Sequence, residues 1–555
     1  MRFGILCNGH SLQQWQLETV QILLYEGHTL ELLIINAYNP QKISFPGKLG
    51  NYPYSKLFVR FWMRYLLKQE AKKEVSIDSL ASEFNEIDCV TTKKGYSEYF
   101  SAADISYIRS FNLDFILRFG FSIIKGEILQ AAKHGIWSYH HDDDKKYRGV
   151  PTGFWEILFN DPVNAAVLQR LTDELDAGII LRKAYFSTIK HSWQANLDNL
   201  LKSTTEWPSQ VCRDIGNGVF TPVEDDRPTE KIYKLPGNLK MFQFALKLAA
   251  NKFRFHFRDL CITEKWNIGI IPQSIERILK PGLTEIPEPV WLPLSSSRSI
   301  YHADGTGFIS NTKLWILCEE YDYRKGVGHL TSFLLESDLH HVAKKTTALQ
   351  KPYHLAFPFV FEYKGKHFCI PENAEGGNID LYEVEENSGR LLFVQTLIPG
   401  LKAIDPVLFF KDQNWWLFFT DTLSTNERLH IWYAEDLLGP YKPHANNPVK
   451  TDVRSSRPAG RLFYYGEILL RPVQDSSMRS GRRIILNQVV KLNPLEFVET
   501  QYAALNPAQD SKFGLGMHTF NVSDNLIVVD GKREIFIWQA LLKKLKLKMN
   551  KILKR

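Results

Sequence analysis

The sequence predicts two domains of different class: an α/β N-terminal domain with a mostly parallel sheet, followed by an all-β five-bladed propeller. Three observations predict this arrangement. The chain of 555 residues is too long for one hydrophobic core. Strand and helix patterns alternate over roughly the first 200 residues. Short aromatic-rich strands repeat over roughly the last 250 residues.

Composition and charge narrow the class of protein further. A hydrophobic content of 44% and an aromatic content of 13% are typical of a globular chain and exclude wholesale disorder. The net charge of +7 comes from residues 541–555, which hold seven Lys and Arg and no acidic residue. Since the rest of the chain is balanced, no nucleic acid partner is predicted.

The six cysteines show no CxxC pairing, which is typical of reduced thiols in a cytoplasmic protein. The N-terminus lacks a secretory pattern, and no stretch of 18 apolar residues occurs. We therefore expect a cytoplasmic protein that does not span a membrane.

The N-terminal domain is predicted over residues 1–205. Strands are expected at Arg2–Cys7 and Thr29–Ile35 on either side of a helix at Gln14–Tyr25, and a further strand at Phe115–Phe121 precedes a helical segment at 126–133. Alternation of this kind predicts a parallel sheet with ligand chemistry at the carboxyl ends of its strands.

Two helical regions accompany this domain. The stretch YSKLFVRFWMRYLLKQEAKK, within residues 40–80, has a basic amphipathic pattern that fits either an insertion helix packed on the domain or a helix that binds a partner or lipid. Residues 206–284, which include LKMFQFALKLAANKFRF, are predicted to be a helical connector.

An internal repeat predicts the propeller over residues 285–535. Five stretches align at anchors separated by 53, 48, 52 and 61 residues, and each contains two apolar strands joined by a polar turn. This period is typical of a four-stranded propeller blade. A strand at Glu288–Leu294 is expected to close the ring against the last blade. The anchors are Asp304, Phe357, Asp405, Arg457 and His518.

The segment GIWSYHHDDDKKYRGV at 135–150 and the loop DELDAG at 173–178 carry the first chemical pattern. Together they resemble the formyltransferase family, which transfers a formyl group from 10-formyltetrahydrofolate to an amine. The family motif reads G-x-x-N-x-H, and its tail ends in R-G. The resemblance covers about residues 110–200 and implies 10-formyltetrahydrofolate as the donor.

The matching positions imply the catalytic residues. His140 stands at the family's general base, Asp176 at the residue that orients it, and Ser138 at the oxyanion-stabilising asparagine. Two side chains at i and i+2 project from one face of a strand, as deprotonation of an amine and stabilisation of an oxyanion require. Because serine is a shorter donor than asparagine, a reduced rate, another acceptor or a lost activity all remain open.

The resemblance also implies where folate binds. It places the folate against Arg118, Phe119 and Gly120 at a strand end, and against Leu175 and Gly178 of the loop. Taken singly, Phe119 and Leu175 fit ordinary core packing as well.

Metal binding is an alternative for the histidine and aspartate run of this segment. Adjacent side chains on a strand point to opposite faces, so at most two could meet one ion, and no metal is predicted. A degenerate fold kept as a scaffold is a further alternative. The residues concerned are His140, His141 and Asp142–Asp144.

The repeat predicts a second site in the propeller channel. Carboxylates that converge there fit glycoside hydrolysis, in which one acts as proton donor and another as base or nucleophile. Glu319 and Asp421 lie at comparable strand ends. The predicted channel residues are Asp304, Glu320, Glu372, Asp405, Arg457 and His518.

The motifs HADGTGF, CEEYDY, AFPFVFEYKGKHFCIPE, IDPVLFF, SRPAGRLF and GMHTFN occur within residues 285–535. They resemble the glycosidase-like N-terminal domain of plant glucosamine inositolphosphorylceramide transferases and, more distantly, family-43 glycosidases. The resemblance implies a five-bladed fold that binds or processes carbohydrate. Trp415 and Trp416 fit blade packing or a sugar platform.

The tail at 536–555 has a basic amphipathic pattern, which fits peripheral contact with an anionic membrane or a solvated end. The sequence as a whole predicts N-formylation of an amino sugar, nucleotide-linked or part of a glycan, in surface-polysaccharide biosynthesis. The alternative is a glycosidase or glycosyl-transfer enzyme acting through Asp304, Glu372 and Asp405, with a degenerate first domain. A third hypothesis is a carbohydrate-binding protein without catalysis.

Overall fold

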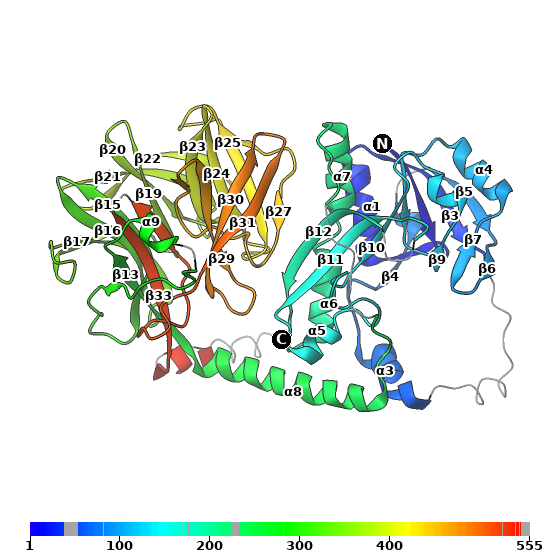
Figure 1. Cartoon of the computed structure of the whole chain (residues 1–555), viewed down its shortest axis with the longest axis horizontal. Coiled ribbons are helices and arrows are strands. Elements are labelled where there is room, and N and C mark those ends of the chain that lie inside the picture. The colour runs from blue at the N-terminus through cyan, green and yellow to red at the C-terminus, as the bar shows by residue number, and fades with distance from the viewer. Residues whose placement is uncertain are drawn as a thin grey trace. The chain divides into compact units, whose positions relative to one another are not determined.

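The structure is a computed structural model that describes residues 1–37, 54–80, 83–174, 178–223, 232–280, 282–523, 525–538, 540–542 and 544–545. The chain divides into two compact units, Met1–Phe253 and Arg254–Arg555. In Figure 1 the first unit runs from blue to green and the second from green to red. Each unit has its own sheets and hydrophobic core.

The first unit is built on a seven-stranded sheet within the described residues, in the order β12-β11-β10-β8-β1-β3-β5. The strands from β5 to β10 are parallel, whereas β11 and β12 continue the sheet antiparallel. The predicted, mostly parallel α/β sheet is therefore present. The bounds are β1 Arg2–Cys7, β3 Thr29–Asn36, β5 Asn85–Cys89, β8 Phe115–Arg118, β10 Ile136–His140, β11 Val163–Arg170 and β12 Ile179–Ser187.

Helices cover this sheet because their apolar side chains recur on one face. In α1, Leu17, Val20 and Leu23 are buried against the strands. The side chain of Ser101 caps α4 and that of Ser192 caps α6, each by accepting a backbone N–H group. The bounds are α1 Gln14–Tyr25, α3 Leu57–Phe61, η2 Trp62–Leu66, α4 Ala102–Ser110, α5 Trp155–Phe159, α6 Trp193–Lys202, α7 Trp207–Gly216 and α8 Asn238–Cys261.

Most predicted element bounds in this unit agree with the structure. Helix α1 has the predicted bounds and β3 extends one residue further. The predicted helical segment at 126–133 is only a short 3₁₀ turn, η4 Glu127–Gln130, which follows Gly126 with a positive φ of 85°. Among the described residues, no helix is both long and apolar enough to cross a bilayer.

Five antiparallel sheets make up the described part of the second unit. Four follow one another along the chain, whereas the fifth joins β13 and β14 to the last strands, β32 and β33. The sheets are β13 Thr263–Ile271, β14 Val290–Trp291, β32 Phe520–Ser523 and β33 Leu526–Ile535; β15 Ile300–Ser310, β16 Lys313–Asp322, β17 Val327–Leu335 and β18 Val342–Leu349; β19 Ala356–Tyr363, β20 Lys366–Glu372, β21 Asn378–Glu385 and β22 Arg390–Pro399; β23 Ala403–Lys411, β24 Asn414–Asp421, β25 Arg428–Ala434, β26 Lys442–Pro443 and β27 Lys450–Thr451; and β28 Phe463–Tyr465, β29 Ile468–Asp475, β30 Arg483–Leu492 and β31 Phe497–Leu505.

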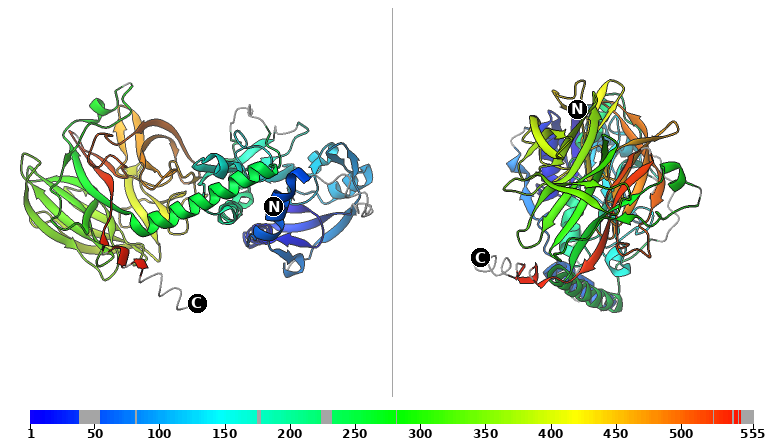
Figure 2. Two further views of the ribbon diagram at one scale, coloured as in Figure 1. Left: turned by 90° about the horizontal axis from the view of Figure 1, so that it is seen from below. Right: turned by 90° about the vertical axis from the view of Figure 1, so that its left-hand side faces the viewer.

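Two predictions about the start of this unit need correction. The predicted connector over 206–284 contains α7, α8 and also β13, a fully paired strand of the second unit. The strand that pairs with β33 is β13, while the predicted closing strand at Glu288–Leu294 is reduced to β14, which pairs with the other edge of β13. Strand β13 is buried along almost its whole length, although it contains Lys265 and Asn267, and it follows directly on the long helical pattern of α8. Figure 2 shows α8 as one continuous helix before this strand.

The predicted C-terminal amphipathic tail is described only in part. Leu542 and Leu545 are exposed, and the Lys544 ammonium donates to the carbonyl of Ile262 at 3.1 Å. Leu547, Ile552 and Leu553 lie outside the described residues. Membrane contact through the tail stays a prediction.

Candidate functional site

Strand β10 carries the predicted catalytic pair of the first unit. Ser138 is buried, and its hydroxyl accepts a hydrogen bond of 2.8 Å from the Arg118 guanidinium. The same guanidinium donates to the carbonyl of Ser122 at 2.7 Å. His140 lies two residues along the strand on the same face, opposite Val167, and is half-buried. The hydroxyl predicted to stabilise an oxyanion is thus held by a neighbouring cation.

The residues predicted to contact folate have local structural roles. Gly120 passes so close to β1 that a Cβ would lie 2.5 Å from the carbonyl carbon of Cys7. Phe119 packs edge-on against Trp15 at 5.5 Å between ring centres, as the core-packing alternative predicted. A Cβ on Gly178 would lie 2.5 Å from the Gln169 amide oxygen. Leu175 and Asp176 lie outside the described residues.

The histidine and aspartate run that follows β10 is used within the fold. His141 stacks on Tyr139 at 5.4 Å, and burial lowers its pKa to about 3. Asp142 accepts the backbone N–H of Gly153 at 2.9 Å, and burial raises its pKa to about 8. Asp143 accepts the N–H of Lys145, and Asp144 pairs with Lys183. These contacts hold the loop in place.

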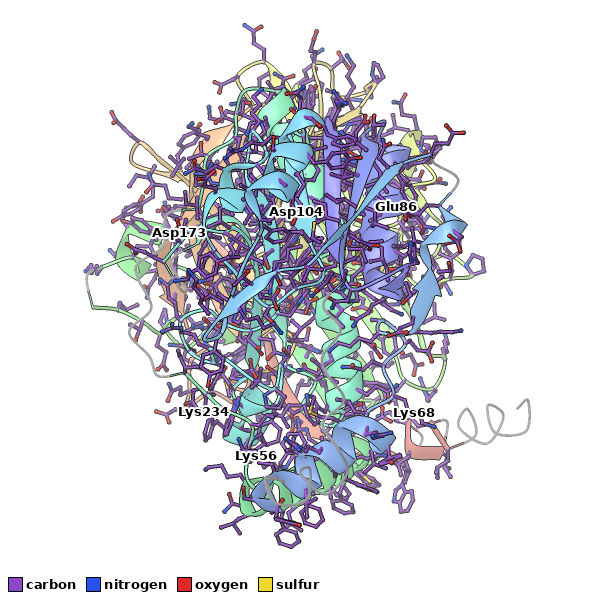
Figure 3. All side chains as sticks on the ribbon, turned by 90° about the vertical axis from the view of Figure 1, so that its right-hand side faces the viewer. Lys56, Lys68, Glu86, Asp104, Asp173 and Lys234 are labelled. Atoms are coloured by element: carbon purple, nitrogen blue, oxygen red, sulfur yellow. The ribbon has the colours of Figure 1, made fainter. Side chains whose placement is uncertain are left out.

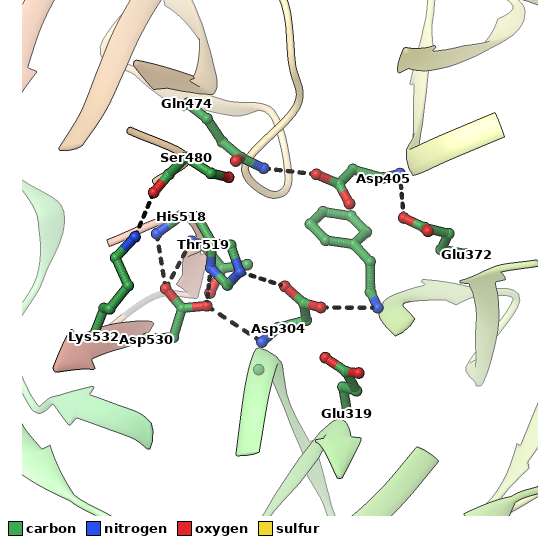
Figure 4. A network of polar contacts seen from close by, with 12 residues as sticks. Asp304, Glu319, Glu372, Asp405, Gln474, Ser480, His518, Thr519, Asp530 and Lys532 are labelled. Atoms are coloured by element: carbon green, nitrogen blue, oxygen red, sulfur yellow. Dashed lines mark hydrogen bonds and ion pairs between the residues drawn. The ribbon is translucent and has the colours of Figure 1, made fainter. Parts of the chain in front are cut away.

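The second unit gathers its polar residues at the positions that the repeat singled out. In β15, β19 and β23 the strand register shifts at Asp304, Phe357 and Asp405, and each of these residues has a positive φ, of 56°, 38° and 48°. A bulge of this kind redirects the side chain from the ladder. Figure 4 shows the carboxylates of Asp304 and Asp405 directed toward a common centre.

Neighbouring sheets are joined at this centre by polar contacts. Asp304 accepts the N–H of Phe357 at 3.3 Å and donates its own N–H to Asp530 at 3.3 Å. Asp405 donates its N–H to Glu372 at 3.1 Å. The N–H of Phe520, in β32, donates to the carbonyl of Ala459, in the loop before β28, at 2.7 Å. The contacts run from each sheet to the next and return to the first.

His518 and Asp530 form one side of the cluster (Figure 4). The His518 imidazole pairs with Asp530 through Nδ1 and lies 3.4 Å from the Asp304 carboxylate through Nε2. Asp530 also accepts the backbone N–H groups of His518 and Thr519. The imidazole stacks on Trp266 of β13 at 3.9 Å between ring centres. His518 is therefore fixed in orientation between two carboxylates.

Asp405 forms the other side of the cluster with Arg457. The guanidinium Nε donates to its carboxylate at 2.6 Å and Nη2 at 3.2 Å. The amide of Gln474, in β29, donates to the same carboxylate at 2.6 Å. Asp405 is thus a neutralised, fully hydrogen-bonded carboxylate, and Gln474 is a member of the cluster that sequence reasoning missed.

Of the adjacent glutamates in β16, Glu319 and not the predicted Glu320 lies at the centre (Figure 4). Glu320 pairs with His302 at 2.9 Å and with Lys345, and these partners lower its pKa to about 2 despite its burial. The prediction was wrong because successive strand residues point to opposite faces. Asp421 likewise pairs within its own sheet, with His430 at 2.9 Å.

The buried carboxyls of the cluster have strongly shifted pKa values. Burial raises the pKa of Asp304 to about 6, opposed by the charge on His518 and reinforced by Asp405. Burial and the neighbouring Asp405 hold the pKa of Glu372 well above its usual range. Burial and Asp304 do the same for Glu319. Burial at this site therefore favours the protonated form of these carboxyls.

His518 shows the complementary effect. Burial alone would lower its pKa, but the charges of Asp530 and Asp304 outweigh burial and raise it. Ligand atoms of Asp304, His518 and Asp530 lie within 4.8 Å of one another, so the three residues could also hold a cation in place of the imidazolium charge. The sequence predicted no metal here.

The predicted aromatic residues have a clear location. Trp415 and Trp416 are both buried in the largest hydrophobic cluster of the second unit, and Trp415 packs edge-on against Tyr363 at 5.4 Å. They pack within the fold, as the first of the two alternatives predicted.

A buried carboxylate centre on a repeated β fold defines the class of site, and comparison with known proteins agrees in the same region. Residues 295–524 match the family model described as the N-terminal part of glucosamine inositolphosphorylceramide transferase 1. A relative of that name from Oryza sativa subsp. japonica is 34% identical over 158 residues, which are 27% of this chain and 21% of the relative. One from Arabidopsis thaliana is 31% identical over 201 residues, or 34% and 26% of the two chains. The chain spans about a quarter of these relatives' length.

Solved structures are similar at low identity. A family 117 glycoside hydrolase from Zobellia galactanivorans has a TM-score of 0.32 and 12% identity, and the match covers 49% of this chain and 90% of the hydrolase. Glycinamide ribonucleotide transformylase 1 from Symbiobacterium toebii has a TM-score of 0.28 and 13% identity, and the match covers 42% and 94% of the two chains.

These findings correct the leading functional prediction. The predicted N-formylation of an amino sugar, and with it a formyltransferase enzyme, is wrong because the matching family and curated relatives are named as glucosamine inositolphosphorylceramide transferases. The predicted resemblance of the C-terminal region to that family is confirmed. Use of 10-formyltetrahydrofolate as a cofactor stays an untested prediction.

Proposed function

We propose that the second unit is a five-bladed propeller whose centre binds a glycosyl residue and breaks its glycosidic bond, passing the sugar to an acceptor hydroxyl. The first unit takes no part in this chemistry. The observation that carries the proposal is the cluster of Asp304, Glu319, Glu372 and Asp405, which come from three separate sheets. Burial raises the pKa of the first three carboxyls.

The propeller assignment is supported by the order of the contacts. Each sheet contacts the next one in chain order. The N–H of Phe520, in the sheet that contains β13 and β33, donates to the loop before β28, so the sheet of β28–β31 also contacts the sheet that holds both ends of the unit. Pairing of β13 with β33 builds one sheet from both ends of the unit. Sheets arranged radially around a centre bring one inner strand each to that centre, as the predicted channel requires.

The pKa values divide the catalytic roles. Burial raises the pKa of Glu372 and so favours its protonated form, which can donate its proton to the glycosidic oxygen as the C–O bond breaks. Asp304, with a pKa of about 6, is largely ionised at neutral pH and can accept the proton of the attacking hydroxyl. Glu319 is the alternative proton donor, since its pKa is also raised.

Asp405 acts through its neighbours. Its carboxylate is ion-paired with Arg457 and hydrogen-bonded to Gln474, so we assign it a positioning role. Its backbone N–H holds the Glu372 carboxyl at 3.1 Å, and its charge helps to raise the pKa of Glu372. The charge of Asp405 therefore favours the protonated form of Glu372, whereas the Asp405 N–H and Arg457 act in the opposite direction.

The names of the curated relatives suggest the sugar to test first. They name glucosamine as the sugar and inositolphosphorylceramide as the acceptor. We take glucosamine as the first candidate for the glycosyl residue and a hydroxylated glycan or glycolipid headgroup as the acceptor class.

The proposal is tested by turnover with the full chain. Para-nitrophenyl α- and β-glucosaminides, together with neutral glycosides, are incubated with and without an inositol acceptor. Release of nitrophenol and new glycosides are measured. We expect Glu372→Gln and Asp304→Asn each to lower turnover about 100-fold or more. Glu383→Gln, at a partly exposed carboxylate paired with Lys366, is the matched control.

The outcomes separate two classes of protein. Turnover that survives both central substitutions would contradict the assigned roles. Saturable sugar binding without any turnover would make the centre a carbohydrate-binding site and would exclude the catalytic proposal.

A further inference from the structure

A surface of the first unit presents large apolar side chains to solvent. It is formed by α3, η2 and the part of α8 up to Phe253, and we call it the α3–α8 surface. The Asn238 amide joins the two helical segments. It donates to the carbonyl of Tyr54 at 2.8 Å and accepts the N–H of Phe58 at 3.1 Å. The two segments therefore form one continuous surface.

Only one side of these helices is needed for packing. Val59, Met241 and Phe244 are buried in a cluster with Phe154 and Trp193 of the first unit. This cluster anchors both helices on the unit. The apolar residues on the other side are therefore not required to complete the hydrophobic core.

The outward side is unusually apolar for a surface in water. Phe58 is 54% exposed, Phe61 53%, Phe242 53% and Leu246 58%. Contiguous exposed apolar patches of this kind mark sites that bind another surface. The further exposed members are Leu57, Met63, Tyr65, Leu66, Leu239 and Phe253.

All charged residues of the same segments are basic. Residues 54–68 and 238–253 contain seven Lys and Arg and no Asp or Glu, although the chain as a whole is nearly balanced outside its last residues. Figure 3 shows Lys56 and Lys68 beside α3, whereas Glu86, Asp104 and Asp173 lie away from it. The α3–α8 surface therefore has aromatic and aliphatic side chains surrounded by cations on long side chains. Such a surface complements a partner that has an apolar interior and negatively charged groups at its boundary with water.

We propose that the α3–α8 surface docks the protein on an anionic lipid bilayer, with its aromatic side chains in the headgroup region and its lysines and arginines on lipid phosphates. Aromatic rings favour that interfacial region, and each cation near it strengthens binding. A second copy is disfavoured because a symmetric contact would bring seven cations against seven. This inference is independent of the proposed function and concerns a different part of the chain.

Vesicle co-sedimentation of the full chain tests the proposal. The probes are vesicles of phosphatidylcholine alone and of phosphatidylcholine mixed in equal parts with phosphatidylglycerol, at low and high salt. We expect binding to the anionic vesicles, weakened by salt and weak or absent with neutral vesicles.

Two kinds of variant locate the contact. The double substitution Phe58→Ser with Phe242→Ser removes exposed apolar area, and Lys56→Glu with Lys247→Glu reverses two charges. We expect each double variant to weaken partitioning by about tenfold or more. The matched control is Phe393→Ser with Phe410→Ser, at rings of the second unit that are 59% and 52% exposed. Circular dichroism melts verify that all variants remain folded.

Three results would overturn the proposal. The first is absence of wild-type binding to anionic vesicles. The second is undiminished binding by both α3–α8 variants, which would assign the contact to another segment such as the basic tail. The third is self-association in light scattering that the same variants abolish, which would identify a second copy as the occupant.

Discussion

At the residue scale, Asp304, Phe357 and Asp405 have backbone conformations that side chains rarely adopt. Each has a positive φ, and a non-glycine residue in this region costs about 1–3 kcal/mol. The cost recurs at the same repeat position in three sheets, where it directs two carboxylates to the centre. Strain that recurs at one place is consistent with a functional site.

The pKa of Asp304 gives a stability prediction. Its folded pKa of about 6 lies above the ordinary value of an aspartate, 3.8, so the folded state binds this proton more tightly than the unfolded state. Ionisation of Asp304 therefore lowers the free energy of unfolding as pH rises from about 4 to about 6. We expect Asp304→Asn to become more stable relative to wild type across this window, by up to ~3 kcal/mol.

Urea unfolding of both proteins at several pH values measures this difference. Glu383→Gln again serves as the control, because its carboxylate is partly exposed and pairs with Lys366 away from the centre. Parallel stability curves for wild type and Asp304→Asn over that window would contradict the assigned environment of Asp304.

The candidate site shows what the sequence could and could not predict about residues. The repeat identified Asp304, Asp405, Arg457 and His518 because the five stretches align on two apolar strands joined by a polar turn, and these residues stand at the aligned anchors. It could not choose between Glu319 and Glu320, since one residue of register exchanges the faces of a strand. Asp530 directly follows the apolar run of the last repeat, within β33, so the same alignment contained the signal that would have identified it.

At the element scale, the contact between β1 and the end of β8 depends on a missing side chain. A Cβ at Gly120 would meet the backbone of Cys7 at 2.5 Å, and backbone atoms cannot move aside easily. We expect Gly120→Ala to destabilise the first unit by about 2 kcal/mol or more. Thermal melts followed by circular dichroism measure the change.

Gly216 at the end of α7 is the matched control, because a Cβ there meets no atom within 4 Å. Gly216→Ala should be neutral or slightly stabilising. Equal melting temperatures for the two variants would contradict the close approach of the β1 and β8 segments.

The sequence predicted an element most accurately where its apolar residues recur at one regular spacing. The helix at Gln14–Tyr25 was predicted with the observed bounds because its apolar spacing is helical. Strand β13 was missed although Trp266, Ile268 and Ile270 occur at every second residue, because this short alternation directly follows the long helical pattern of α8. Its partner β33 lies more than 250 residues away in the chain, so no local signal could reveal the pairing.

At the scale of the whole molecule, β13 determines where the second unit begins. The sequence placed this start at residue 285, whereas β13 at Thr263–Ile271 forms nine register pairs with β33. We expect a chain of residues 254–555 to unfold cooperatively and a chain of residues 285–555 to fail to fold, since β33 would lose its partner and His518 would lose Trp266. Near-ultraviolet circular dichroism and urea titration compare the two. A shorter chain that unfolds as cooperatively as the longer one would contradict this boundary.

The central claim is that the carboxylate centre of the second unit takes a sugar, and titration calorimetry with a methyl glucosaminide tests it most directly. The account predicts a saturable heat for the full chain that is lost in Asp304→Asn and Glu372→Gln and kept in Glu383→Gln. It also predicts that Ser138→Ala leaves the heat unchanged, because the first unit takes no part. Absence of heat across a panel of glycosides, or a heat that persists in both central variants, would contradict the account.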